Sequence, residues 1–349
     1  MKHGGDLISY ADYYQGELID FSSNINPLGP PEGLKRELIN SFNTLISYPD
    51  IQYRYLRKAI SEYLKCNIEN VIVGNGAVEI INNIIHLFKR VIVFIPSFSE
   101  YEDRARVFGK EVLKLNYLED FSLDLENLEE NMMEGDLLVL GNPNNPTGLR
   151  IEIEELKKAY EIVRAKGGFL LLDEAFFEFC PEDYDSIDIF SDEDFKGVGI
   201  IRAATKFFAL PGIRLGYACT SKDMVEEYKK IELPWSVNVL ADCAGRYIFN
   251  CKDYIDKSKR YIEAERKFLL GELSKIEGIK VYTTHTNYIL IKLLNWDEEF
   301  VFHKFLKDGL VVRKCSSFDG LDKSYIRVAI KDRDKNLRLI KSFKELERL

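Results

Sequence analysis

Five unbroken apolar runs of strand length, separated by helical patterns, constrain the fold of this chain more than any other feature of its sequence. A strand that is apolar at every position has both faces buried, as in a mostly parallel sheet that is covered by helices. The pattern from residue 34 to residue 240 therefore predicts an α/β domain with such a sheet. The five runs span residues 71–73, 91–95, 137–140, 169–172 and 198–201.

The pattern changes after about residue 240, where a long charged helical segment precedes short strand-like stretches and a closing amphipathic helix. Mixed helices and strands of this kind predict a smaller α+β domain over residues 241–349. Residues 1–33 are too few to fold alone, so we expect them to join the smaller domain. A length of 349 residues suits two domains, of which the larger spans residues 34–240.

Charge and composition exclude several classes of function. The chain carries 48 Lys and Arg against 57 Asp and Glu, a net charge of −9, which argues against nonspecific binding of nucleic acid. No apolar run approaches the ~20 residues that span a bilayer, and the first residues lack the apolar core of a signal peptide. The short apolar runs therefore predict that the protein binds no membrane. Six scattered cysteines without a Cys-x-x-Cys pair predict a cytoplasmic protein, and four dispersed histidines predict that it binds no metal.

Glycine-rich and polar segments follow the apolar runs, at the edge of the sheet where ligands of α/β proteins bind. Residues 74–79 precede a helical pattern and suit either an anion at a helix N-terminus or a plain turn, because Glu79 replaces the third glycine of a dinucleotide fingerprint. Residues 141–148 read Gly-Asn-Pro-Asn-Asn-Pro-Thr-Gly, a rigid turn that presents asparagine amides. This density of glycine, proline and asparagine predicts a binding loop.

Two ionisable residues follow later strands. Asp173 closes the run at residues 169–172, where a buried carboxylate is costly unless it is paired, so it suits a helix N-cap or a cation partner. Lys206 lies in a nearly uncharged stretch, with Arg214 eight residues later. Because a partly desolvated amine loses its proton more easily, Lys206 is a candidate for forming a Schiff base.

Taken together, these motifs resemble the pyridoxal-phosphate enzymes of the aspartate aminotransferase fold, over nearly the whole chain and most specifically at residues 141–148. The resemblance implies a mostly parallel seven-stranded sheet, a smaller α+β domain and a homodimer with active sites at its interface. It also implies that Lys206 is the catalytic residue and binds pyridoxal 5′-phosphate covalently. The other implied cofactor contacts are Asp173 at the pyridine nitrogen, Asn145 at the 3′-oxygen, Phe98 on the ring, and Gly76, Ala77, Thr205, Arg214 and the other subunit's Tyr48 at the phosphate.

Within that fold the chain looks like the branch that holds threonine-phosphate decarboxylase and histidinol-phosphate aminotransferase. Residues 3–6, 20–31, 205–212 and 313–321 resemble the first enzyme, which predicts decarboxylation of L-threonine O-3-phosphate to aminopropanol phosphate for cobalamin biosynthesis. The alternative is transamination of histidinol phosphate with 2-oxoglutarate. By the same resemblance, the candidates for binding a small phosphorylated amino acid are Arg327, Arg313, His3, Ser23 and Asn24.

Phe176 departs from the aminotransferase pattern, which usually places a tyrosine there to donate a hydrogen bond to the 3′-oxygen. Phenylalanine cannot donate, so either the cofactor is tuned differently or Asn145 suffices and Phe176 only packs. Two interpretations from other classes stay open at this point. One is a noncatalytic protein that keeps the fold, and the other is a nucleotide-binding dehydrogenase that uses Gly74 and Gly76.

Overall fold

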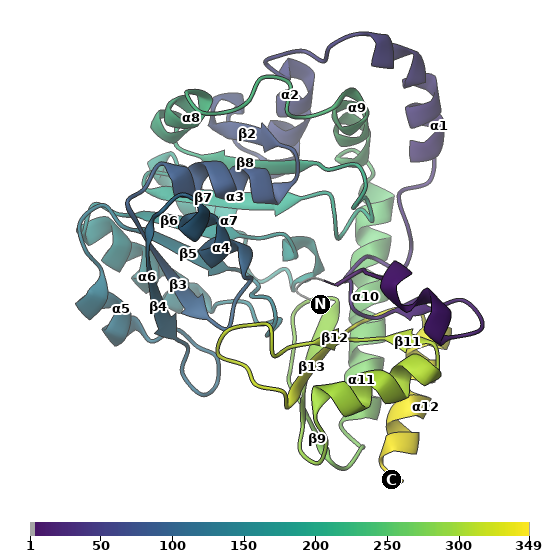
Figure 1. Ribbon diagram of the computed structural model, residues 1–349. Coiled ribbons are helices and arrows are strands. Elements are labelled where there is room, and N and C mark those ends of the chain that lie inside the picture. Colours follow the sequence, from purple (N-terminus) through teal and green to yellow (C-terminus); the bar gives the residue numbers. More distant parts are fainter. Residues whose placement is uncertain (1–3, 349) are drawn as a thin grey trace.

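A computed structural model describes residues 4–348 and places a seven-stranded sheet at the centre of the larger part of the molecule (Figure 1). The strand order is β2-β8-β7-β6-β5-β3-β4. Neighbours from β7 through β4 are parallel, whereas β8 runs antiparallel to both β7 and β2. The strands are β2 (Val71–Gly74), β3 (Arg90–Ile95), β4 (Glu111–Asn116), β5 (Leu137–Gly141), β6 (Phe169–Asp173), β7 (Val198–Ala203) and β8 (Gly216–Thr220).

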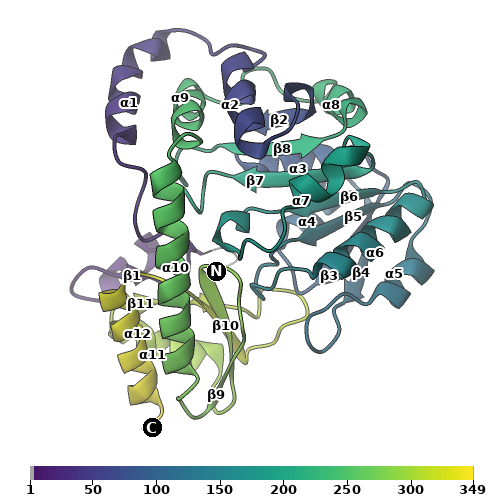
Figure 2. The ribbon, with the colours of Figure 1, turned by 180° about the vertical axis from the view of Figure 1, so that it is seen from behind.

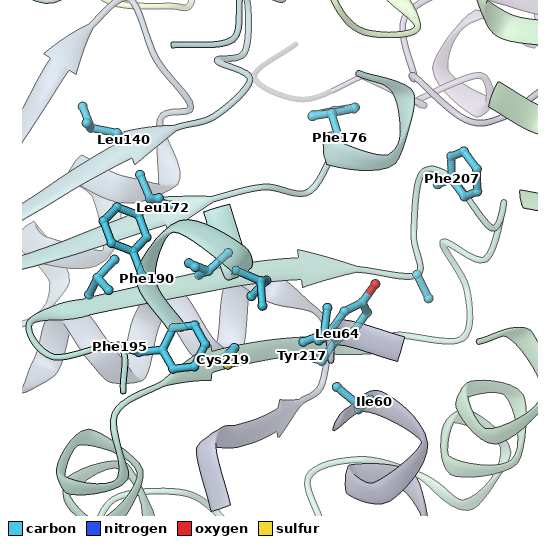
Figure 3. Packing of buried hydrophobic residues seen from close by; sticks show 14 of the residues in the cluster. Ile60, Leu64, Leu140, Leu172, Phe176, Phe190, Phe195, Phe207, Tyr217 and Cys219 are labelled. Carbon is cyan, nitrogen blue, oxygen red and sulfur yellow. The ribbon is translucent and has the colours of Figure 1, made fainter. Parts of the chain in front are cut away.

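All five predicted apolar runs are strands of this sheet, and the α/β fold class is confirmed. Each run is unbroken because its alternate side chains enter two different cores. Leu138 and Leu140 of β5 pack on one side of the sheet, and Leu137 and Val139 pack on the other. Figure 3 shows part of the first of these cores, with Leu140 and Leu172 on neighbouring strands and Phe190 beside Leu172.

Helices cover both faces of the sheet. Buried residues of α3, α4 and α8 belong to one core, and those of α2, α5, α6, α7 and α9 belong to the other. These helices and their neighbour α1 are α1 (Leu34–Asn40), α2 (Arg54–Leu64), α3 (Ala77–His86), α4 (Glu100–Val107), α5 (Leu125–Asn131), α6 (Ile153–Ala165), α7 (Ser186–Phe190), α8 (Lys222–Lys229) and α9 (Val239–Ile248). Short 3-10 helices are η1 (Ile8–Tyr13), η2 (Phe42–Ile46), η3 (Ile68–Asn70), η4 (Phe177–Phe179) and η5 (Ser191–Glu193).

The smaller part of the molecule contains a four-stranded antiparallel sheet in the order β12-β13-β10-β9. The N-terminal strand β1 (Ile19–Asp20) pairs in parallel with β11 (Leu310–Val311), and Phe21 is buried in the same core as these strands. The other elements are α10 (Lys252–Leu273), β9 (Ile279–Val281), β10 (Tyr288–Leu293), α11 (Glu298–Lys307), β12 (Arg313–Lys314), β13 (Tyr325–Ala329) and α12 (Arg333–Leu346).

Helix α10 joins the two parts and runs from α9 to the far end of the smaller sheet (Figure 2). Its Ile262 packs in the core of the large sheet, whereas Leu269 and Leu273 pack in the smaller core. The residues between the predicted boundary at 240 and the middle of α10 therefore belong to the large core. None of the helices between residues 4 and 348 combines the length and the apolar character that crossing a membrane would need.

Candidate active site

A cavity of about 250 Å³ lies between the large sheet and the smaller one, and three distant parts of the chain line it. On the large sheet its lining residues lie at or just after the carboxyl ends of strands, where the topology predicts a ligand site. The smaller sheet and the segment before α1 supply the rest. Eleven of the predicted site residues line the cavity: Ser23, Asn24, Ala77, Phe98, Asn145, Asp173, Thr205, Lys206, Arg214, Arg313 and Arg327.

Lys206 lies in the turn that follows β7, and buried aromatic residues fix that turn. Phe207 and Phe208 are fully buried beside it, and the Phe207 carbonyl accepts a hydrogen bond from Asn26 Nδ2 at 2.8 Å. Burial, and then the neighbouring Arg327 guanidinium, lower the pKa of Lys206 to about 8. Near neutral pH an appreciable fraction of this amine is therefore unprotonated and nucleophilic.

Asp173, the last residue of β6, presents a buried carboxyl group to the cavity. Tyr101 Oη of α4 donates to its Oδ2 at 2.8 Å, and the Ala175 amide donates to its Oδ1 at 3.1 Å. Burial raises the pKa of Asp173, and the Tyr101 hydrogen bond opposes that rise by favouring the carboxylate. A cation placed against this group would complete its neutralisation, so the position suits a protonated ring nitrogen.

An anion cradle forms where Arg214 meets the N-terminus of α3. Gly76 caps the helix with a φ of 81°, and a Cβ there would lie 2.3 Å from Arg214 Nη2. A Cβ at Gly216 would lie 2.4 Å from the Ala77 amide nitrogen, so the strand also approaches the helix terminus closely. A guanidinium and a helix N-terminus that face one space bind phosphate well. Gly76 is not part of the cavity wall, and its role is to leave room for the Arg214 guanidinium, because it has no side chain.

The three asparagines of residues 141–148 have different surroundings. Asn142 is fully buried and donates to Glu174 Oε1 at 3.2 Å, and Asn144 donates to the Pro96 carbonyl at 2.9 Å. Asn145 alone lines the cavity, where its Oδ1 accepts a hydrogen bond from Arg327. The first two hold the loop in place, and the third is available to a ligand.

Two buried arginines from the smaller sheet reach the same cavity. Arg327 of β13 donates to the Ser22 carbonyl at 2.8 Å, and its Nε has no hydrogen-bond partner within residues 4–348. Arg313 of β12 donates to Ser317 Oγ at 2.6 Å. Burial, and then Arg327, lower the pKa of Arg313 to about 10. Two buried guanidiniums beside a cavity favour an anionic ligand strongly, because an anion relieves both the desolvation and the repulsion.

Besides Gly76, the predicted site residue Tyr48 is not in the cavity wall. Tyr48 is 79% exposed and contacts the Trp235 ring at a centroid distance of 4.6 Å. His3 lies outside the described residues. Phe176 does line the cavity, and its ring packs edge-on against the Tyr288 ring at a centroid distance of 5.0 Å. Among residues 4–348, no group of three or more His, Cys, Asp or Glu side chains could hold a metal ion.

Several residues of the site were not predicted from the sequence. Tyr101 lies on α4, three residues after the predicted site residue Phe98. Side chains at this spacing can point to the same side of the chain, so the position of Phe98 could have indicated Tyr101. Ser22, Ser317 and Phe318 lie in segments that resemble threonine-phosphate decarboxylase, but no local pattern assigns them to the site, because the folding of the smaller part brings them in.

Comparisons with known proteins agree with this geometry. The family model described as aminotransferase class I and II matches residues 16–343. A provisionally named threonine-phosphate decarboxylase of Caldanaerobacter subterraneus is 41% identical, over 99% of this chain and 94% of its own. The threonine-phosphate decarboxylase of Salmonella typhimurium is 31% identical, over 99% and 96% of the two chains. The crystal structure of the histidinol-phosphate aminotransferase from Clostridium acetobutylicum superimposes with a TM-score of 0.90 at 37% identity, over 95% and 99%. The chain therefore belongs to the aminotransferase class I and II family.

Proposed function

We propose that this protein binds pyridoxal 5′-phosphate and uses it to decarboxylate L-threonine O-3-phosphate. The observation that carries the proposal is the placement of two anion-binding centres around one reactive lysine. Arg214 and the N-terminus of α3 lie on the large-sheet side, and Arg313 and Arg327 lie on the small-sheet side, with Lys206 in the same cavity. The first centre suits the phosphate of the cofactor and the second suits the anions of the substrate.

The residues of the large part fit the cofactor group by group. Lys206 is the amine that would hold it, Asp173 would pair with its ring nitrogen, and Arg214 would bind its phosphate. When bound, the cofactor supplies an electron sink that takes up the electrons of a bond broken at the substrate α-carbon. The other residues that would contact it are Ala77, Phe98, Asn145 and Thr205.

The choice of substrate follows from the number of charges to be neutralised. L-Threonine O-3-phosphate carries a carboxylate and a phosphate, and the cavity offers two buried guanidiniums on one side, those of Arg313 and Arg327. The free Nε of Arg327 leaves a donor for a planar carboxylate. How these groups orient the substrate decides whether carbon dioxide or a proton leaves the α-carbon. Lys206 lies in the same cavity and would carry a proton to or from that carbon.

A second candidate is transamination of histidinol phosphate with 2-oxoglutarate. It is supported by the 37% identity to the histidinol-phosphate aminotransferase of Clostridium acetobutylicum. Histidinol phosphate has a phosphate but no carboxylate, so it would engage the two arginines less fully. For this reason we favour the decarboxylation.

One assay separates the two reactions. We expect the purified protein with pyridoxal 5′-phosphate to release carbon dioxide from L-threonine O-3-phosphate, with kcat/KM at least about 100-fold above its value for histidinol phosphate. Glutamate formation from 2-oxoglutarate is measured in parallel with each amine donor. Glutamate from histidinol phosphate, without carbon dioxide from threonine phosphate, would overturn the proposal in favour of the aminotransferase.

We further propose that the chain forms a homodimer through the surface around α1, η2 and α2. Within residues 4–348 this surface gathers nine exposed large apolar side chains, and Arg214 is exposed to solvent at the cofactor-phosphate centre. In such a dimer the partner's Tyr48 would reach that phosphate. The exposed residues are Ile39, Phe42, Leu45, Ile46, Tyr48, Ile51, Tyr55, Leu233 and Trp235.

Light scattering after gel filtration tests the dimer. We expect a molar mass twice the 40.5 kDa of one chain, because apolar patches of this extent are rarely left in water. A double substitution in the middle of the patch, Phe42→Glu with Ile46→Glu, should shift the protein toward the monomer. A wild-type protein that elutes as a monomer at micromolar concentration would contradict the proposal.

A further inference from the structure

Residues 20–26 cross from the smaller sheet to the Lys206 turn, and side chains bind their carbonyl groups one after another. Arg327 donates to the Ser22 carbonyl at 2.8 Å, Lys331 Nζ to the Ser23 carbonyl at 3.2 Å, and Asn287 Nδ2 to the Asn24 carbonyl at 3.0 Å. At the far end the Asn26 amide donates to the Lys206 carbonyl at 3.0 Å. This segment therefore ties the wall of the smaller sheet directly to the reactive lysine.

Asp20 anchors the start of this segment. Its backbone lies in β1, between the Ile19 amide bonded to the Gly309 carbonyl and the Phe21 amide bonded to the Val311 carbonyl, both at 2.8 Å. Its Oδ1 accepts from the Ser22 amide at 2.8 Å, from Ser22 Oγ at 2.6 Å and from the Ser23 amide at 3.1 Å. Its Oδ2 accepts from Ser23 Oγ. A single carboxylate thus folds the turn that lines the cavity.

The same carboxylate acts on three cations. Burial lowers the pKa of Lys206, of Arg327 and of Lys331, and in each case the negative charge of Asp20 opposes that lowering. Other charges also face Lys206: Arg327 from β13, Lys331 after β13, and Arg214 lower its pKa, and the buried Asp173 of β6 lies across the cavity. Cations therefore outnumber carboxylates around the reacting amine.

We propose that Asp20 is a positioning residue with two separable effects: it folds the Ser22–Ser23 turn into the cavity wall, and it places a negative charge on the segment that binds Arg327 and Lys331 and reaches the Lys206 turn. The first effect needs hydrogen-bond acceptors, and the second needs a net charge. An asparagine at position 20 keeps an acceptor oxygen for the three bonds on Oδ1 but carries no charge. An alanine provides neither. The two substitutions therefore separate the effects.

The test measures the titration of Lys206 and does not use turnover. The full-length chain, freed of bound cofactor, is labelled with a trace of acetic anhydride at a series of pH values, and peptide mass spectrometry quantifies acetylation at Lys206. For D20N we expect the midpoint to move to lower pH by roughly half a unit, since a nearby opposite charge has been removed. The sign follows because the loss of a carboxylate favours the neutral amine. A midpoint that coincides with that of the wild type would overturn the charge effect.

Two further variants complete the test. Asp332 faces Lys331 but not Lys206, and it caps α12 through the Lys335 amide, so D332N should leave the Lys206 midpoint in place. A shift in D332N as large as that in D20N would show a general charge effect and overturn the assignment to Asp20. For D20A we expect a lower Tm than for D20N, by about 3 °C or more, because the turn loses its acceptors. Equal Tm values for the two variants would overturn the folding effect.

The inference rests on the proposed role of Lys206 as the reacting amine, but its test is independent of the reaction. If neither carbon dioxide nor glutamate forms, the proposed function fails while the titration of Lys206 can still shift in D20N. If turnover is found and the titration does not move, only the inference about Asp20 fails.

Discussion

Replacing Lys206 by alanine is expected to lower kcat by at least about 10⁴-fold, because one side chain both holds the cofactor and carries the proton at the substrate α-carbon. The cations that surround Lys206 are poor substitutes for it. Arg327, Arg214 and Lys331 are the other cations around it; two are guanidiniums, which stay protonated, and Lys331 is bonded to the Ser23 carbonyl at 3.2 Å. Steady-state turnover and the visible absorbance of the protein with pyridoxal 5′-phosphate measure the two losses.

The control for this prediction is stability. Because Lys206 is a desolvated cation among other cations, its removal should leave the Tm unchanged or raise it. Lys206→Arg keeps a charge of similar reach but cannot bond covalently to the cofactor, so it should be as inactive as Lys206→Ala. If the alanine variant keeps its fold, its visible absorbance and more than a hundredth of its turnover, Lys206 is not the reacting amine.

The second large effect is expected behind the site, where Arg202 of β7 lies fully within the protein. Its guanidinium donates to Glu174 Oε2 at 3.0 and 2.9 Å and to Asp185 Oδ1 at 2.5 Å, and it stacks 3.5 Å from the Phe177 ring centroid. Arg202→Met would leave Glu174 charged or force it to take up a proton, since that residue has no exposed surface. We expect a loss of about 3–5 kcal/mol in the free energy of unfolding, or roughly 5–15 °C in Tm.

A pair of variants tests whether the loss comes from the orphaned carboxylate. The double variant Arg202→Met with Glu174→Leu should recover part of the stability, because the carboxylate that Arg202 binds most directly is then removed together with it. The exposed pair of Lys229 and Glu226 gives the matched control, and Lys229→Met should hardly change the Tm. A Tm for Arg202→Met as close to wild type as that of Lys229→Met would contradict the prediction.

The strands that could be predicted from the sequence are those whose two faces are both buried. The missed strands, β4 and β8, have other patterns. β4 is at the sheet edge and exposes Glu111 and Lys114, so it lacks an apolar run. β8 follows the Lys206 turn closely, and its five residues, Gly-Tyr-Ala-Cys-Thr, do not form an apolar run. Edge strands and short connections carry weak periodic signals, because one face or one neighbour is missing.

The site could be predicted where a residue stands directly at the end of a strand. Asp173 ends β6 and Lys206 lies three residues after β7, so the topology rule alone places them at the same edge of the sheet. The bond from Tyr101 to Asp173 joins residues 72 apart, and that from Arg327 to the Ser22 carbonyl joins residues 305 apart. No local pattern encodes such pairs, since they depend on how α4 and the smaller sheet dock on the large one.

The cavity is built from the segment before α1, the loops of the large sheet and two strands of the smaller one. A substrate anion bound at Arg327 would lie where all three meet, because Arg327 also donates to Asn145 and to the Ser22 carbonyl. Such an anion would bind weakly to a chain in which any one of them had come away, so its binding free energy would stabilise the complete fold, by RT ln(1 + [L]/Kd). In a cell, the supply of substrate would then help to set how much of this chain escapes proteolysis.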